Sequence, residues 1–324
     1  MGPVTRKIAP STTPMEAASA EFDTHRDLLY ALVYNVLGSV ADTEDVLQET
    51  WLAWAAAPGR AEVANPRAYL VRIAINDALA RLTRLRRDRS IYPGPWLPDP
   101  MLTEADASEQ ALRSESVSLA MMVVLETLTP LERAVFVLKD AFGYSHPEIA
   151  DLIGRTPVSV RQVAHRARQH VRQQRGRYQV DRETWRAVTE RFLTAAIGGD
   201  LNALLEVLAP DVAMWTDGGG LPGTARRVIT GRDKVVRLLN AVTGLADGLD
   251  AAFVEVNGGP AAVLYRGDAP YAVVVLDIRP EDGFVRAIYN IVSPDKLRGV
   301  AATRPGRPQA APVCVPEYPV PAGD

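Results

Sequence analysis

The most concentrated chemistry in the sequence is a group of arginines between residues 152 and 180. This stretch contains seven arginines and no aspartate or glutamate, whereas the whole 324-residue chain has a net charge of −3. The arginines are Arg155, Arg161, Arg166, Arg168, Arg172, Arg175 and Arg177. A guanidinium group can bind phosphate oxygens or bond the edge of a guanine in bidentate fashion. Positive charge concentrated in this way predicts a surface that binds nucleic acid.

The sequence around these arginines predicts a helix-turn-helix. Ser145 and Glu148 have the spacing of a capping box at the start of a short helix. Gly154 then supplies a turn, and Thr156-Pro157 begins a second helix that carries most of the arginines. A helix presented in this way enters the major groove of duplex DNA. The alternative is a basic helix that merely faces solvent, which would not need these caps and this turn.

The second helix has a face suited to reading bases near its start. We expect DNA contacts from Ser159, Arg161, Gln162, His165, Arg166 and Arg168. Gln can bond adenine as Arg bonds guanine, whereas Arg168 and Arg172, further along, are better placed for phosphates, which carry little sequence information. The buried side is expected to consist of Val158, Val160, Val163, Ala164 and Ala167.

An upstream helical unit is predicted between residues 21 and 90. Apolar residues recur at helical spacing up to Gly38, and Asp42 is a plausible cap for an acidic second helix that Pro58-Gly59 ends. Asn65 can cap a third helix that begins at Pro66. This third helix starts apolar and ends rich in arginine.

A proline-rich linker is predicted over residues 91–116, between this unit and a second helical unit at 117–177. Trp96 and Leu97 lie between its prolines. A plain spacer would be polar, so this apolar pair implies a surface that covers it.

The composition changes after Asp181. Two helices, of which the first ends at Gly198-Gly199, precede a series of strand-like segments. The expected strands are 212–216, 251–257, 261–267, 271–278 and 285–292. Their Val, Ile and Tyr content suits a curved antiparallel sheet, so residues 181–298 are predicted to form an α+β domain.

Composition also excludes some classes of protein. Cys314 is the single cysteine, so no disulfide can form within the chain, which fits a cytoplasmic protein. No apolar run approaches the roughly 18–20 residues that span a bilayer, so no membrane association is expected. Residues 1–20 are expected to be a disordered leader rather than a secretory signal, with Met15 a candidate start, and residues 299–324 a disordered tail.

The order of these segments resembles the extracytoplasmic-function class of bacterial sigma factors over residues 21–177. The segment DTEDVLQE contains the DxxQE pattern of that family's region 2, and its residues Asp45, Gln48 and Glu49, followed by Trp51, are then expected to bind the clamp of the largest RNA polymerase subunit. The helix from Pro66 resembles the part that recognises the −10 promoter element. The residues implied in DNA binding there are Asn65, Arg72, Asn76, Arg81 and Arg84, with Asn76 at the pocket for a flipped base.

The same resemblance makes the helix-turn-helix the family's region 4, which reads the −35 element and contacts the polymerase flap. Structural alternatives remain for the upstream motifs. The acids of residues 42–49 could simply stabilise the N-terminus of their own helix, and Asn76 could be an ordinary surface amide.

The remainder of the chain resembles the cone-shaped SnoaL-like fold that a subgroup of these sigma factors carries at its C-terminus. The subgroup's WLPEP, DGGGK and NPDKL motifs correspond to WLPDP, DGGGL and SPDKL at residues 96–100, 217–221 and 293–297. The residues to which a regulatory role is assigned by resemblance are Trp96, Leu97, Pro98, Asp217, Gly218, Gly219, Gly220, Pro294, Asp295, Lys296 and Leu297. Leu221 replaces the motif's lysine, which puts a charge role of that loop in doubt. Each motif also has a structural alternative, such as a flexible turn or a helix start.

Folds of this shape enclose a pocket, and enzymes of the fold place an Asp or His there as a base. All four histidines precede Asp181, which leaves Asp217 and Asp277 as acids, with Tyr265, Tyr271 and Tyr289 as hydroxyl partners. Neither acid has an obvious second partner, so we expect a binding or regulatory role, no catalytic residue, and no metal or cofactor. An unidentified small ligand could occupy the pocket.

Three functional hypotheses follow. The first is a sigma factor that binds core RNA polymerase and promoter DNA, with the C-terminal domain regulating it in cis by docking against the linker and the two DNA-binding units. The second is a ligand-sensing helix-turn-helix transcription factor that acts without polymerase; the DTEDVLQE segment argues against it. The third is a DNA-tethered cyclase or isomerase.

Overall fold

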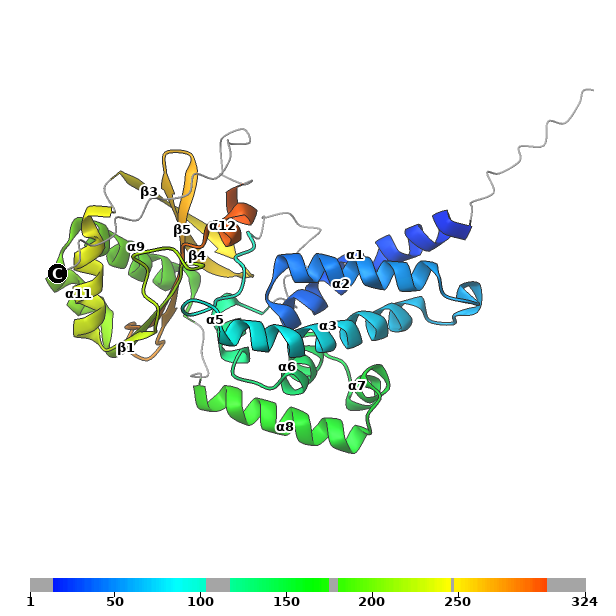
Figure 1. Ribbon diagram of the computed structural model, residues 1–324. Helices are drawn as coiled ribbons and strands as arrows, with labels where there is room; N and C mark the ends of the chain where they lie inside the picture. The colour runs from blue at the N-terminus through cyan, green and yellow to red at the C-terminus, as the bar shows by residue number, and fades with distance from the viewer. Residues whose placement is uncertain (1–13, 103–116, 175–179, 246–247, 302–324) are drawn as a thin grey trace, which may run out of the picture.

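The computed structural model describes residues 14–102, 117–174, 180–245 and 248–301. Two helical units and an α+β domain make up this part of the chain, and they lie against one another rather than apart (Figure 1). Residues 91–102, which include the Trp96-Leu97 pair, run between them.

The first helical unit is a bundle of three long helices. Its elements are α1 (Pro14–Leu37), α2 (Val40–Ala55), the short turn η1 (Arg60–Glu62) and α3 (Pro66–Ser90). Asn65 caps α3 as predicted, accepting the Ala68 N–H at 3.0 Å. The predicted cap at Asp42 is wrong: Ser39 caps α2 and Asp42 lies in its first turn, because Ser39 Oγ accepts the Asp42 N–H.

The predicted disorder of residues 1–20 is wrong from residue 14 onward. Helix α1 already begins at Pro14, and Ala18 is buried with its carbonyl accepting a hydrogen bond from Trp54 Nε1 at 3.1 Å. The small side chain of Ala18 lets α1 extend across the tryptophan, a tertiary contact with no local sequence signal. Residues 1–13 lie outside the described part of the chain.

The second helical unit contains the predicted helix-turn-helix. Its elements are α5 (Leu119–Leu125), α6 (Pro130–Phe136), η2 (Val137–Ala141), α7 (His146–Ile153) and α8 (Pro157–Gln174). Capping boxes begin α6 and α7, from Thr129 with Glu132 and from Ser145 with Glu148. Gly154 ends α7 at a φ of 65°, a left-handed conformation that favours glycine. The positions of the turn and of α8 were therefore readable from the sequence.

The two helical units share one hydrophobic core. The buried cluster runs without a break from Ala18 in α1 to Val171 in α8. Helix α3 lies between α1 and α2 on one side and α6 and α7 on the other (Figure 1). The second unit therefore covers one face of α3, the helix that the sequence predicts to bind −10 DNA. We call this arrangement of the two helical units the closed form.

The C-terminal domain is a six-stranded sheet with helices on both faces. Its helical elements are α9 (Arg182–Gly198), α10 (Leu201–Val207), α11 (Arg232–Val242), η3 (Thr243–Leu245) and α12 (Pro294–Ala301). Its strands are β1 (Leu208–Asp217), β2 (Ile229–Thr230), β3 (Leu249–Val256), β4 (Gly259–Arg266), β5 (Ala269–Ile278) and β6 (Val285–Ile291). The strand order is β2-β1-β6-β5-β4-β3.

The expectation of a purely antiparallel sheet needs correction. β1 and β6 pair in parallel, whereas all other neighbouring strands pair antiparallel. A parallel pair requires a long crossover, which is provided by all the elements between β1 and β6. Helix α11, which the sequence reading missed, lies within that crossover.

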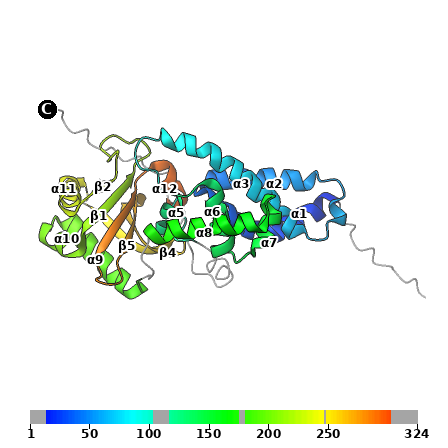
Figure 2. The ribbon, with the colours of Figure 1, turned by 90° about the horizontal axis from the view of Figure 1, so that it is seen from below.

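The two faces of the sheet have different partners. Helices α9, α10 and α11 cover one face, and α5, the linker and α12 cover the other (Figure 2). The predicted tail from residue 299 is wrong at its start, because α12 continues to Ala301 and Val300 is fully buried. Residues 302–324 are not described. No helix in the described ranges is long and apolar enough to cross a membrane.

Candidate nucleic-acid interface and linker junction

Helix α8 presents a polar face at its N-terminal half. Arg161, Gln162 and His165 are exposed there, as predicted for residues that read bases, and Ser159 is half-buried. The prediction for Val158 is wrong, since this side chain is 60% exposed and adds an apolar contact to the same face. Val160, Val163, Ala164 and Ala167 form the buried side as expected.

Two of the predicted DNA-binding arginines on α8 are held by acids in the closed form. Arg166 Nε lies 3.4 Å from Glu132, and Arg168 Nε lies 2.8 Å from Asp140. The side chain of Arg168 also lines a shallow groove with His165, Gln169, Arg172 and Gln173. These ion pairs hold the two arginines against α6 and η2.

The acidic face of α2 is exposed, as a docking surface requires. Asp45, Gln48 and Glu49 lie on it, together with Leu52, which is 53% exposed. The sequence predicted Trp51 rather than Leu52 as the apolar residue of this surface, but Trp51 is partly packed against the core. The spacing of 45, 48, 49 and 52 places all four side chains on one helical face, a signal that was present in the sequence.

Arg81, predicted to bind −10 DNA, is directed at α2. It pairs with Asp42 at 2.7 Å, with Asp45, and with Glu49 at 3.8 Å. Arg81 thus supports the proposed polymerase face in this form. Arg72 and Arg84 are exposed on α3, and Asn65 serves as its cap.

The side chain of Asn76 is exposed, but its amide nitrogen is not free. Its side-chain amide donates to the Arg72 carbonyl at 2.6 Å and to the Leu152 carbonyl of α7 at 2.9 Å. A groove of about 520 Å³ adjoins this contact, with Tyr69 and Arg72 of α3 on one side and Tyr144 and Asp151 on the other. The amide nitrogen of Asn76 is therefore already engaged while the two helical units stay together.

A buried carboxylate holds the linker to the C-terminal domain. The Asp217 side chain is 0% exposed at the end of β1. It accepts hydrogen bonds from the Leu97 N–H at 2.8 Å, the Tyr92 hydroxyl at 2.6 Å and the Gly219 N–H at 3.2 Å. Burial and the bond to Asp217 raise the pKa of Tyr92, so its hydroxyl remains a donor.

Lys296 supplies the opposite charge. Its ammonium lies 2.8 Å from Asp217 and 3.6 Å from Asp99, and it also donates to the Leu97 carbonyl. The same ammonium lies 4.2 Å from the centroid of the Trp96 ring. The Arg89 guanidinium lies 3.4 Å from the same ring centroid. Trp96 is therefore held by two cations. Lys296 thus supplies the positive charge at the buried carboxylate, whereas Leu221 of the glycine-rich loop carries none.

The linker residue expected to act as an anchor is buried. Leu97 is fully buried in a cluster with residues of the sheet and of α12, including Leu297. Asp295 differs from its neighbours: it is exposed and pairs with Arg298 on its own helix at 2.8 Å. Pro294 begins α12, and Pro98 is buried.

The three glycines after Asp217 are needed for close packing rather than flexibility. A Cβ on Gly218 would lie 2.4 Å from Thr224 Oγ1, and one on Gly219 would lie 2.5 Å from Ser293 Oγ. A Cβ on Gly220 would lie 3.1 Å from Pro93 of the linker. Gly219 and Gly220 also have positive φ angles, of 61° and 90°.

The linker is bonded to the first helical unit as well. Asp99 accepts the Val40 N–H at 2.8 Å and donates its own N–H to the Gly38 carbonyl at 2.9 Å. Asn257, at the β3–β4 turn, exchanges hydrogen bonds with Met101 and donates to the Tyr34 hydroxyl of α1. Residues 92–101 thus form a junction, here called the linker junction, between α1, α2 and the sheet.

A second buried cluster joins the two helical units beside this junction. Glu126, at the end of α5, pairs with Arg89 of α3 at 2.7 Å and with Arg133 of α6. Arg89 and Arg133 also donate to the Leu37 and Asn35 carbonyls of α1. Burial alone would raise the pKa of Glu126, but Arg133 and Arg89 outweigh it and lower that pKa.

The two acids considered for catalysis, Asp217 and Asp277, do not share a site. Asp217 faces the linker, and Asp277 pairs with Arg286 at 2.8 Å on its own sheet. Among the described residues, no group of three or more His, Cys, Asp or Glu could hold a metal ion.

Comparison with known proteins agrees with this arrangement. Residues 22–88 match the family model described as Sigma-70 region 2, and residues 118–171 match Sigma-70, region 4. The chain is 35% identical to "ECF RNA polymerase sigma factor SigJ" of Mycobacterium tuberculosis over 295 residues, 86% of this chain and 93% of that protein. It is 31% identical to "Probable ECF RNA polymerase sigma factor SigI" of the same species, over 87% of this chain and 95% of that one.

The architecture is also shared with a solved structure. The crystal structure of the Mycobacterium tuberculosis extracytoplasmic function sigma factor SigJ matches with a TM-score of 0.67 and 33% identity, covering 87% of this chain and 98% of that one. The match therefore spans the C-terminal domain as well as the two helical units. On these grounds the chain belongs to the extracytoplasmic-function sigma factors of RNA polymerase.

Proposed function

We propose that this chain directs core RNA polymerase to promoters, in the cytoplasm, and that its C-terminal domain restrains it in cis through the linker junction. Sigma factors bind core polymerase and promoter DNA and are not enzymes. The proposal assigns polymerase binding to the exposed face of α2, −10 recognition to α3 and −35 recognition to α8.

One observation carries the regulatory part. The linker that joins regions 2 and 4 is bonded through Leu97 to a fully buried carboxylate of the C-terminal domain. In the same form the Asn76 amide is bonded to region 4. Promoter reading by Asn76 therefore requires the two regions to separate, and the C-terminal domain holds the segment that must move.

A binding role for the C-terminal domain is favoured over catalysis. Its apolar cavity is lined by no charged side chain, and the two acids of interest are engaged elsewhere in ion pairs. A general acid or base for isomerase chemistry would have to face that cavity. We therefore propose that the domain regulates and does not catalyse.

The first test is direct. The full-length protein should bind core polymerase in a pull-down and support run-off transcription from promoters identified by sequencing the DNA it opens. Absence of core binding would remove the sigma function. Binding to a duplex operator without polymerase, with no transcription, would instead favour the ligand-sensing transcription factor.

Substituting Leu52→Asp should weaken core polymerase binding at least about tenfold. Loss of an exposed apolar contact and gain of a charge cost about 1.5–3 kcal/mol at a docked surface. The matched control is Leu201→Asp, which changes a leucine that is 40% exposed on α10 of the C-terminal domain. Equal affinities of both variants, measured by titration with labelled core polymerase, would exclude the α2 face.

Substituting Arg161→Ala and Arg172→Ala should have different effects on the holoenzyme. Loss of Arg161 should cost about 1–3 kcal/mol and relax base preference at one position of the −35 element. Loss of Arg172 should weaken binding to all sequences alike and reduce the salt slope by about 1. Binding to a randomised −35 library at several salt concentrations measures both. A uniform loss for Arg161→Ala would refute its role in base reading.

A further inference from the structure

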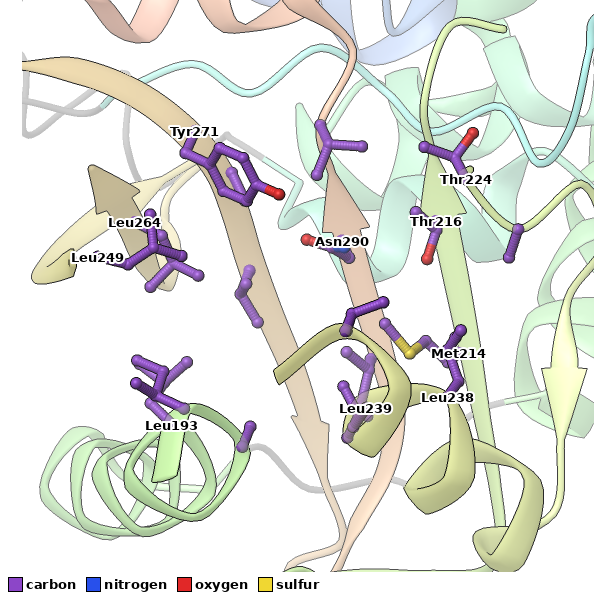
Figure 3. A pocket seen from close by; sticks show the side chains of 18 of the residues that line it. Leu193, Met214, Thr216, Thr224, Leu238, Leu239, Leu249, Leu264, Tyr271 and Asn290 are labelled. Carbon is purple, nitrogen blue, oxygen red and sulfur yellow. The ribbon is translucent and has the colours of Figure 1, made fainter. Parts of the chain in front are cut away.

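The C-terminal domain contains an apolar cavity on the face of the sheet opposite the linker. Its volume is about 140 Å³, and it is lined by residues of α9, α11, the strands and the loop at 223–225. Figure 3 shows Leu193, Leu238 and Leu239 in the lower part of the view, with Tyr271, Asn290, Thr216 and Thr224 in the upper part. The polar, uncharged side chains thus gather in the upper part of the view, where Leu249 and Leu264 lie beside them, and the lower part is apolar.

The polar end contains hydrogen-bonding groups that the protein does not use. Thr216 on β1 and Asn290 on β6 are directly paired in register, so their side chains lie next to each other on the cavity face. Within the described ranges, neither side chain has a hydrogen-bond partner. A threonine hydroxyl and an amide can together donate to and accept from one hydroxyl or carbonyl group.

We propose that this cavity binds a neutral ring compound with a single hydroxyl or carbonyl group. An apolar cavity of about 150 Å³ admits one benzene ring, which sets the size of the ligand. A carboxylate or ammonium is excluded, because the lining offers no opposite charge to a desolvated ion. The ring packs against the leucines, and its polar group bonds Thr216 and Asn290.

The cavity and the linker junction share a wall. Thr216 faces the cavity and the adjacent Asp217 faces the linker, since successive side chains of a strand point to opposite faces. Val292, which lines the cavity, donates its N–H to the Asp217 carbonyl at 2.9 Å.

The loop of residues 218–225 forms another part of this wall. Thr224 lines the cavity and packs against Gly218, whereas the outer side of the loop meets the linker at Pro93 and Gly94. A ligand that completes the cavity stabilises this loop in its docked position. Binding therefore strengthens the hold on the linker and keeps regions 2 and 4 closed. This inference rests on the proposed regulatory role of the domain.

The probe is p-cresol, with toluene and p-toluate as controls that lack the hydroxyl or carry a charge. Binding to the full-length protein is measured by calorimetry, and hydrogen exchange is measured for the peptide that contains Leu97. We expect p-cresol to bind, toluene to bind more weakly and p-toluate not to bind. At p-cresol concentrations ten times its Kd, exchange at Leu97 should slow about tenfold.

Variants test the polar end. Asn290→Leu should weaken p-cresol binding about fivefold and leave toluene binding unchanged, because only the hydrogen bond is lost. Thr216→Val, which is nearly isosteric, should also weaken p-cresol binding, and it serves as the test if Asn290→Leu fails to fold. Absence of p-cresol binding, equal binding of toluene, or binding without slower exchange at Leu97 would each overturn the inference.

Core polymerase binding measured without p-cresol separates the two proposals. Failure of polymerase binding removes the proposed function, whatever the cavity binds. Failure of p-cresol binding, with normal polymerase binding, removes the cavity inference alone.

Discussion

Substituting Asp217→Ala is expected to release the linker and raise the apparent affinity for core polymerase at least about tenfold. The substitution leaves the Lys296 ammonium, whose side chain is 9% exposed, without its nearest anion and the Leu97 N–H without its acceptor. Breaking a buried ion pair in this way costs about 3–5 kcal/mol. Because polymerase is expected to contact region 2 at its clamp and region 4 at its flap, and the docked state holds these regions together, loss of docking increases the fraction of protein competent to bind.

The effect of Asp217→Ala is tested with two further variants and one control. Lys296→Met should act in the same direction, and the double variant Asp217→Asn/Lys296→Met should be milder than Asp217→Ala, because no buried charge is left unpaired. The control is Asp277→Ala, which removes an ion pair with Arg286 within the same domain. Hydrogen exchange of residues 91–99 and titration with core polymerase are measured for each. Unchanged exchange in Asp217→Ala would contradict the linker junction.

Substituting Glu126→Ala should also promote separation of regions 2 and 4, by removing the shared anion of the buried cluster between them. Arg133, whose side chain is 1% exposed, and Arg89 would lose their shared anion. We expect a loss of about 3 kcal/mol and a melting temperature lower by roughly 5–10 °C. A labelled core polymerase should also bind this variant more tightly than the unaltered protein.

The control for Glu126→Ala is Glu190→Ala. Glu190 pairs with Arg186 on the surface of α9, where both side chains are about half exposed. Removal of such a pair should change the stability by less than about 0.5 kcal/mol. A melting temperature of Glu126→Ala within about 2 °C of the unaltered protein would show that the cluster does not stabilise the closed arrangement.

The helical units were predictable because their boundaries are set locally. The cap at Asn65, the capping box at Ser145 and the turn at Gly154 are short-range patterns, and each lies where the sequence predicted it. Pairing of β1 with β6 depends on segments some 70 residues apart. Local patterning gives the strands but not whether they run parallel, so the sheet was only partly predicted.

The candidate site was likewise predictable from the sequence only in part. Leu97 was predictable as an anchor, because an apolar residue between prolines implies a covering surface. The partners of Asp217 and the direction of Arg81 were not, since both depend on how the units pack. Asn257 lay outside every motif, yet its amide bonds both the linker and α1.

The most direct measurement is the distance between α3 and α8 in the full-length protein. Spin labels at positions 80 and 169, both exposed, with Cys314 replaced by serine, report it by double electron–electron resonance. We expect one short, narrow distance distribution for the free protein and a clearly longer one after core polymerase and promoter DNA are added. A distribution that stays short in the polymerase-bound complex would contradict the claim that regions 2 and 4 must separate to read a promoter.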